Sequence, residues 1–227
     1  MKILAFDTAT EACSAALLID GDIRERFEVA PRGHARLLLP MLDALLNEAG
    51  LGLAALDAIA FGRGPGSFTG LRIAAGIAQG IAFAVDLPVV PVSTLQALAR
   101  DALLRSTATD VLAAIDARMG EVYWAAYRRG EGNEPQPLCT EMVSPADAVR
   151  VPSGHRWIGI GSGWATYTAA LSAHFTRDLL EIDAEALPRA AQIAQLAAVE
   201  FAAGNAVSAE LALPVYLRNE VAQRPGT

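Results

Sequence analysis

The sequence has few of the residue types that build metal sites and disulfide frameworks. It contains two cysteines, Cys13 and Cys139, and three histidines among 227 residues. Two isolated cysteines exclude a disulfide framework and a cysteine-based zinc site, and they are typical of a protein of the reducing cytoplasm. His34, His155 and His174 are far apart and show no ligand spacing, so we expect structural roles for them and no metal site.

Positive charge is also scarce. Lysine and arginine total 18 against 25 aspartates and glutamates, so the formal net charge is -7 and the pI is about 5.0. Sequence-independent binding to a phosphate backbone depends on clustered lysine and arginine. The composition therefore argues against direct binding to nucleic acid, and any role with RNA would be indirect.

Long hydrophobic runs are missing as well. The longest uncharged apolar stretch, 73–85, is too short to span a bilayer, and "MKILAFDT" reaches an aspartate too early for a signal peptide. Apolar residues nevertheless make up 53% of the chain, enough for a sizeable core. We expect a soluble cytoplasmic protein with no membrane partner.

Hydrophobic periodicity in the first half predicts an α/β order. The expected elements are a hairpin over 3–21, a third strand over 23–30, helices over 34–49 and 68–85, and strands over 58–62 and 88–92. Pro40 is expected to kink the first helix or to mark a late start.

The second half repeats the opening of the first. "LAAIDARMGEVYWAAY" aligns with "ILAFDTATEACSAAL" and pairs Asp116 with Asp7. Such a repeat indicates duplication of one lobe. We therefore predict an α/β protein of two duplicated RNase H-like lobes, mixed sheets flanked by helices, over 1–105 and 106–227. This architecture resembles that of the actin-like ATPases.

In the actin-like architecture, the aspartates flank a cleft for phosphate and metal. Asp7, Thr8 and Asp116 are accordingly candidates for weak binding of ATP, ADP or magnesium, although we expect no resident cofactor. The alternative is that both aspartates are turn residues, because aspartate satisfies its own backbone in turns.

A glycine-rich loop, "GRGPGSFTG", precedes the second long helix. No Lys-Ser or Lys-Thr follows the last glycine, which excludes a P-loop, and Gly62, Gly64 and Gly66 do not form the dinucleotide pattern. The loop is either a tight strand-to-helix turn or an anion cradle at a helix N-terminus. We favour a rigid turn.

Within this architecture, "GRGPGSFTGLRIA", "FDTATEACSAAL", "LPVVPVSTLQALA" and the late "PVYLR" resemble the TsaB (YeaZ) family. The resemblance covers essentially the whole chain. It implies a role in the bacterial machinery that places threonylcarbamoyl on adenosine 37 of tRNAs reading ANN codons. The role is that of a non-catalytic partner beside a larger paralogue, TsaD, and the ATPase TsaE.

The resemblance also implies where the metal of TsaD would lie. The paralogue holds it with two histidines, and Thr94 and Leu98 occupy those places in "STLQAL". Threonine is a weak neutral donor and leucine cannot coordinate. We therefore expect no metal and no independent activity.

Both long helices carry surplus apolar surface, which indicates a partner. The family is implied to associate through N-lobe helices, with TsaD or with a second copy as a homodimer. The expected interface residues are Leu38, Leu42 and Leu45 on the first helix and Ile73, Gly76, Ile77, Gly80 and Ala84 on the second. Gly76, Gly80 and Ala84 form a row that lets another helix approach closely. The alternative is that both helices are internal to one lobe.

A rival hypothesis makes the chain an enzyme in its own right. It would be an actin-like nucleotide phosphotransferase or hydrolase using Asp7 and Asp116 with magnesium. A peptidase is weaker, since no Ser, His and acid constellation is visible. "DTATEACS" lacks the second glycine and the basic residue of working phosphate turns.

Overall fold

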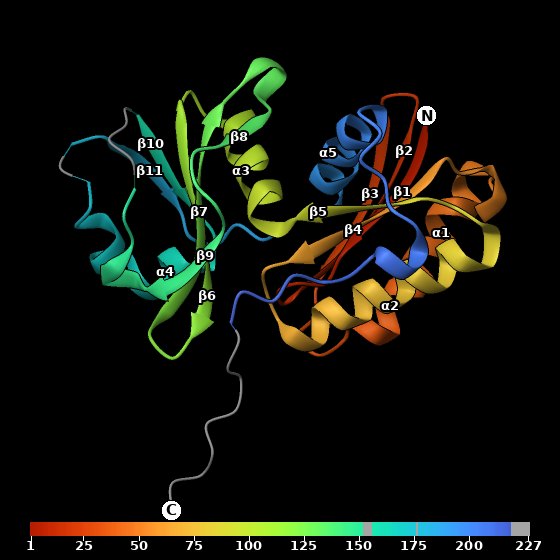
Figure 1. Cartoon of the computed structure of the whole chain (residues 1–227), viewed down its shortest axis with the longest axis horizontal. Helices are drawn as coiled ribbons and strands as arrows, with labels where there is room; N and C mark the ends of the chain where they lie inside the picture. The colour runs from red at the N-terminus through yellow and green to blue at the C-terminus, as the bar shows by residue number, and fades with distance from the viewer. Residues whose placement is uncertain (152–155, 176, 219–227) are drawn as a thin grey trace, which may run out of the picture.

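A computed structural model describes residues 1–151, 156–175 and 177–218. The chain forms two lobes that lie side by side, each built on one β-sheet with helices on its faces (Figure 1). The two sheets confirm the predicted α/β class and its duplication, as their strand orders show below.

The first sheet has the order β3-β2-β1-β4-β5. β1 pairs antiparallel with β2 and parallel with β4, and β2 and β3 complete a meander. Its strands are β1 (Lys2–Asp7), β2 (Ala12–Ile19), β3 (Asp22–Val29), β4 (Ala58–Gly64) and β5 (Val89–Ser93). β1 and β2 are buried on both faces, which explains why their sequences are continuous apolar runs.

Starting from β8, the second sheet repeats this order as β8-β7-β6-β10-β11, and β9 also pairs with β7. β6 pairs antiparallel with β7 and parallel with β10, as β1 does with β2 and β4. Its strands are β6 (Asp110–Arg118), β7 (Glu121–Arg129), β8 (Pro135–Pro137), β9 (Met142–Pro145), β10 (Trp157–Ile160) and β11 (Leu179–Asp183).

Five α-helices lie in the described part of the chain: α1 (His34–Ala49), α2 (Phe68–Val85), α3 (Thr94–Arg105), α4 (Ser162–Ser172) and α5 (Ala190–Ala202). Short 3-10 turns cover Leu53–Ala55, Glu131–Asn133, Ala146–Ala148 and Ala209–Leu211. α1 continues through Pro40, so the expected late start is wrong. α1 ends at Gly50, whose left-handed conformation suits glycine.

Two of the helices pack on the sheet that is formed by the other half of the sequence. α1 and α2 cover one face of the first sheet, and α5, from the end of the chain, covers the other face (Figure 1). α3, which follows β5, packs instead on the second sheet, opposite α4. The expected division into 1–105 and 106–227 thus separates the two sheets, whereas it assigns α3 and α5 to the wrong lobes.

The first sheet itself supplies the groups that hold the start of α5. The Ser14 hydroxyl accepts the Ala190 N–H at 3.0 Å, and the Glu25 carboxylate accepts the Ala191 N–H at 3.0 Å. Glu25 also forms an ion pair with Arg189 at 2.5 Å. Side chains of β2 and β3 therefore cap a helix that lies more than 160 residues later in the chain.

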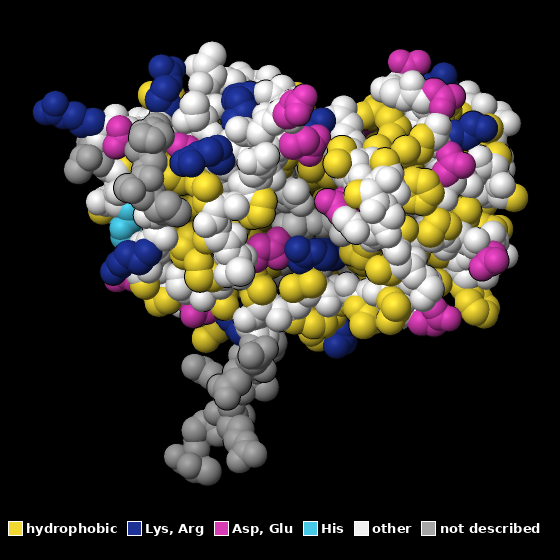
Figure 2. Space-filling view, turned by 45° about the horizontal axis from the view of Figure 1, so that its top comes forward, with side chains coloured by type: hydrophobic (Ala, Val, Ile, Leu, Met, Phe, Trp, Pro, Cys, Tyr) yellow, Lys and Arg dark blue, Asp and Glu magenta, His cyan; other side chains and the backbone are white. Residues whose placement is uncertain are grey.

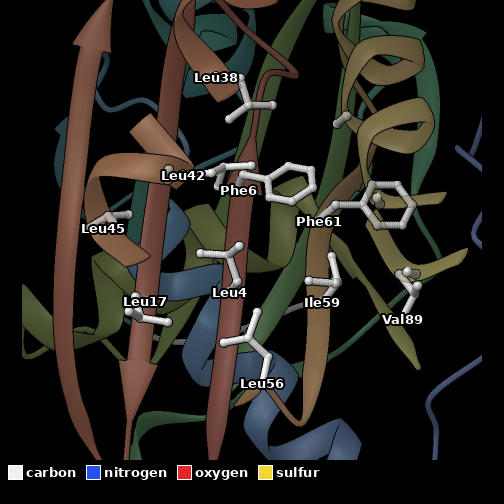
Figure 3. Packing of buried hydrophobic residues seen from close by; sticks show 14 of the residues in the cluster. Leu4, Phe6, Leu17, Leu38, Leu42, Leu45, Leu56, Ile59, Phe61 and Val89 are labelled. Atoms are coloured by element: carbon white, nitrogen blue, oxygen red, sulfur yellow. The ribbon is translucent and has the colours of Figure 1, made fainter. Parts of the chain in front are cut away.

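The core of the first lobe contains three residues that the sequence assigned to a partner surface. Leu38, Leu42 and Leu45 are almost fully buried and point toward Phe6, Leu4 and Leu17 of the sheet (Figure 3). That assignment is wrong for these leucines, because the lobe's own sheet covers the apolar side of α1.

α2 is long and apolar enough to cross a membrane by length and composition alone. In the fold it packs along β4, with Leu71, Ala74, Ala78 and Ala82 turned to the core. Ile73 and Ile77, which were expected at the interface, are half-buried and pack against the core of the first lobe.

Candidate functional site

A cleft of about 480 Å³ lies between the two lobes. The space-filling view shows hydrophobic side chains spread over the first lobe and most of the basic side chains of this face over the second (Figure 2). The lining comes from the β1–β2 turn, the glycine-rich loop with the start of α2, the β6–β7 turn, the start of α4, and the last described residues, 215–218.

Asp116 is the one candidate ligand of the three that lines this cleft. Its carboxylate accepts the Arg118 N–H at 2.8 Å and the Tyr167 hydroxyl at 3.3 Å, and it pairs with the Arg118 guanidinium at 3.3 Å. Its own N–H donates to Ser162. Four contacts within the lobe thus hold this residue at the rim of the cleft.

Asp7 is fully buried and does not belong to the described lining of the cleft. One carboxylate oxygen accepts the Ala9 N–H at 2.9 Å, and the other has no hydrogen-bond partner. Burial raises the pKa of Asp7 to about 6, against the smaller opposing effect of the Ala9 N–H. A Cβ at Gly62 would lie 1.8 Å from the unpartnered oxygen, so glycine there leaves room for the carboxylate.

Thr8 is buried as well, and it contacts the first turn of α2. Its hydroxyl donates to the Gly70 carbonyl at 2.7 Å, and a Cβ at Gly70 would lie 1.8 Å from the Thr8 carbonyl oxygen. The Ser67 N–H donates to the Ala9 carbonyl at 2.7 Å. The glycine-rich loop therefore brings the first turn of α2 against the β1–β2 turn, as a rigid strand-to-helix turn does.

The two aspartates share one local geometry, in which each carboxylate accepts the N–H two residues later. This is the Asx turn that the sequence left open as the alternative to a ligand pair. Asp7 and Asp116 occupy equivalent places in the duplicated lobes, yet only one of them reaches the cleft.

Within the described residues, no group of three or more His, Cys, Asp or Glu could hold a metal ion. Thr94 and Leu98 are buried at the start of α3. His34 begins α1 with its ring 3.2 Å from the Ala12 carbonyl. His174, half-buried, lies 3.3 Å from the Ala146 carbonyl, and His155 lies outside the described residues.

The outward side of α2 is a second candidate site. Gly76, Gly80 and Ala84 are exposed, and a Cβ at either glycine would meet nothing within 4 Å. We call this side the α2 face; it comprises Phe68, Arg72, Gly76, Gly80, Phe83 and Ala84. The row of small residues expected from the sequence is therefore open to solvent, and its contact with a partner remains a prediction.

Sequence reasoning missed the large side chains around this row. Phe83 is 80% exposed, and Leu39 of the neighbouring α1 is 53% exposed. Leu211, the last residue of the 3-10 turn beside α2, and Leu213, two residues later, are more than half exposed. Phe83 lies within the apolar run 73–85, whereas the position of Leu211 and Leu213 beside α2 depends on tertiary structure alone.

Comparison with known proteins places this architecture. A family model described as "TsaD: tRNA N6-adenosine threonylcarbamoyltransferase" matches residues 28–225. The "tRNA threonylcarbamoyladenosine biosynthesis protein TsaB" of Escherichia coli K12 is 46% identical and covers 98% of this chain and 96% of its own length. The protein of the same description from Haemophilus influenzae is 45% identical over 97% of this chain and 95% of its own length. This chain belongs to the TsaB family.

Solved structures extend the TsaB-family match to three dimensions. "YeaZ from Pseudomonas aeruginosa" is 48% identical and covers 95% of this chain and 99% of that chain, with a TM-score of 0.88. A second structure, described as an uncharacterized protein with similarity to peptidase YEAZ from the same organism, has the same identity and TM-score over 96% of this chain and 99% of its own. The duplicated lobes and the cleft described above are thus placed within the TsaB fold, which shares its family model with TsaD.

Proposed function

We propose that this chain acts in tRNA N6-threonylcarbamoyladenosine biosynthesis as a non-catalytic partner that docks on the metal-bearing paralogue TsaD. The observation that carries the proposal is the near full-length similarity to TsaB proteins, which are named for that pathway. Catalysis would belong to the paralogue, and this chain would keep it in a competent conformation.

The interior of the chain supports a non-catalytic role. Thr94 and Leu98, at the places implied for the paralogue's ligand histidines, are buried within the protein, and the Thr94 hydroxyl has no partner. Asp7 has a single hydrogen bond and no exposed surface. These residues would present neither a metal nor a nucleotide to a substrate.

The α2 face supports a docking role. Phe68 and Phe83 flank Gly76 and Gly80 on the outward side, so a helix of TsaD could approach the α2 backbone closely between two aromatic rings. Without TsaD, the same face would pair with a second copy as a homodimer. TsaE and tRNA would be reached only through the complex, in the cytoplasm.

The rival function is an actin-like phosphotransferase or hydrolase that uses the cleft. The observation in its favour is a cavity of about 480 Å³ with a mixed polar and apolar lining that includes Asp116. Against it, Asp116 pairs with Arg118 and Asp7 is sealed from the cavity. We therefore expect at most weak binding of ATP, ADP or magnesium, with no turnover.

The test replaces Gly80 with leucine. Because its Cβ points into open space, the G80L variant should fold and melt like the wild type, while a close helix-helix contact tolerates the added side chain poorly. We expect capture of purified TsaD to weaken by about tenfold or more, an effect of roughly 1 to 3 kcal/mol. Reconstituted tRNA modification should fall in parallel.

Two variants act as controls. Gly80→Ala should bind nearly as well and stabilise the helix by up to about 1 kcal/mol. Ala169→Leu places the same side chain on the exposed part of α4 in the other lobe and should leave binding unchanged. Wild-type affinity in folded G80L would remove the α2 face from the interface, and tRNA modification that does not depend on this chain would overturn the function.

A further inference from the structure

The last described segment, Ala212–Arg218, which we call the strap, joins the two lobes. It leaves the core beside α2, runs along the start of that helix, and ends at the β6–β7 turn of the second lobe (Figure 1). Residues 215–218 of the strap also line the cleft. The strap is thus in contact with both candidate sites.

Backbone contacts fix the strap to the first lobe. Ala212 is fully buried, and its carbonyl accepts the Gln79 side-chain N–H at 3.3 Å. The Val215 N–H donates to the Arg63 carbonyl at 2.8 Å, at the end of β4. The strap is therefore held by β4 and α2, the two elements on either side of the glycine-rich loop.

Tyr216 connects the strap to the α2 face. Its ring lies 5.3 Å from that of Phe68, and its hydroxyl accepts the Arg72 Nε–H at 3.2 Å. The Arg72 guanidinium in turn lies 3.8 Å above the Phe68 ring. The three side chains form one stack at the start of α2, and any movement of Tyr216 changes the shape of the α2 face.

Arg218 connects the strap to the second lobe. Its guanidinium forms an ion pair with Glu121, the first residue of β7, and donates to the Arg118 carbonyl at 3.4 Å. The Arg218 side chain is 19% exposed. These contacts close one end of the cleft.

Arg63 adds a second link between the lobes at the same place. Its carbonyl holds Val215, while its guanidinium makes two hydrogen bonds to the Glu141 carboxylate of the second lobe, at 2.9 and 3.1 Å. Paired bonds of this kind fix orientation as well as distance. Movement of the second lobe away from the first would therefore disturb the strap from two directions.

We propose that the strap is a conformational clamp that couples closure of the interlobe cleft to the shape of the α2 face. With Arg218 bound to the second lobe, Tyr216 is held against Phe68 and the start of the α2 face is ordered. Release of Arg218 frees Tyr216 and lowers affinity for a partner on that face. The coupling to a partner rests on the proposed function, whereas the clamp itself does not.

The test reverses the charge of Arg218 and then restores the ion pair. In R218E a glutamate faces Glu121; in the double variant R218E/E121R the pair is rebuilt with its charges exchanged. We expect the Val215 amide to exchange its hydrogen about two- to fivefold faster in R218E, as the loss of a partly exposed ion pair predicts. The double variant should return to the wild-type rate.

Affinity for purified TsaD should follow the same order, with a loss of about two- to fivefold in R218E and recovery in the double variant. Arg156→Glu, which alters an exposed arginine of the second lobe that contacts Thr107, should change neither measurement. Unchanged Val215 exchange in R218E would overturn the clamp.

Two other outcomes are distinguishable. Faster Val215 exchange with wild-type affinity would overturn the coupling to the α2 face. Failure of the wild-type chain to bind TsaD would overturn the proposed function, and the exchange rates of the chain alone would still decide on the clamp.

Discussion

Each lobe has the same Asx turn after its first strand, but the surroundings of the two turns differ. In the first lobe, the turn at Asp7 is closed off, and its aspartate has no exposed surface. In the second lobe, the turn at Asp116 opens on the cleft, and the Arg118 side chain beside it is 85% exposed. Both turns line the cleft, but only the second lobe places its aspartate there.

The difference comes from how closely a helix approaches each turn. A Cβ at Gly70, in the first turn of α2, would lie 1.8 Å from the Thr8 carbonyl oxygen. At Gly163, in the first turn of α4, a Cβ would lie 3.0 Å from the backbone of Ala114, a β6 residue two positions before Asp116, so α4 packs on the strand and leaves the turn itself open. Asp7 is thus covered by the residues around it, whereas Asp116 faces the cleft.

Among the variants that test this difference between the two lobes, Gly70→Ala is expected to have the largest effect on stability. The added methyl group meets backbone atoms that cannot move aside without shifting β1 or α2. We expect a loss of about 3 kcal/mol or more in the free energy of unfolding, against about 1 kcal/mol for Gly163→Ala. Urea unfolding of the two variants gives the ratio, and equal losses would mean that both helices approach their turns equally.

The second effect concerns the charge of Asp7. The carboxyl has a pKa of about 6 when folded and an ordinary value near 3.8 when unfolded. Below about pH 3 both states are protonated and the difference vanishes; as the pH rises through 6, the folded state is destabilised by about 3 kcal/mol. Asp7→Asn should therefore raise the free energy of unfolding by roughly 2 to 3 kcal/mol at pH 8.

The same variant has a built-in control in its pH dependence. Its gain over the wild type should shrink to about 0.5 kcal/mol at pH 4 and to near zero at about pH 3, which paired urea titrations at about pH 3, 6 and 8 measure. A gain that does not depend on pH would show that the buried charge is not its cause. A loss of stability at pH 8 would indicate a cation beside the carboxylate.

The smallest effect is expected for Asp116→Asn. The amide oxygen can still accept the Arg118 N–H, and the lost ion pair joins a side chain that is largely exposed. We expect a change of less than about 0.5 kcal/mol in the free energy of unfolding. Calorimetric titration with magnesium and ATP should give the same weak signal before and after the substitution, whereas abolition of tight binding would favour the enzyme hypothesis.

Most of the first lobe follows from local patterns in the sequence. The bounds of α1 and α2 match the prediction because an apolar period, a glycine stop and a capping serine mark them. The Asx turns at Asp7 and Asp116 were foreseen as an alternative, because aspartate makes that turn from its own side chain. What the sequence could not tell was that only Asp116 reaches the cleft.

The parts that escaped prediction depend on distant contacts. α3 carries a buried arginine, Arg100. From the sequence alone an arginine is expected at the surface, and only the fold brings its partners Gln195 and Glu134 to it. The apolar surplus of α1 was interpreted as a partner surface, although the sheet already covers Leu38. The contribution of Leu211 to the surroundings of α2 likewise appears only in the folded chain.

The capping of α5 by Ser14 and Glu25 sets an order of events during synthesis. The ribosome releases β1 and β2 first, and the helix that covers their second face, α5, is synthesised long after them. Until then Ile3 and Leu18 have no cover on that side. The nascent chain thus exposes an apolar sheet face until α5 has been synthesised, and exposed apolar surface of this kind is what chaperones protect from aggregation.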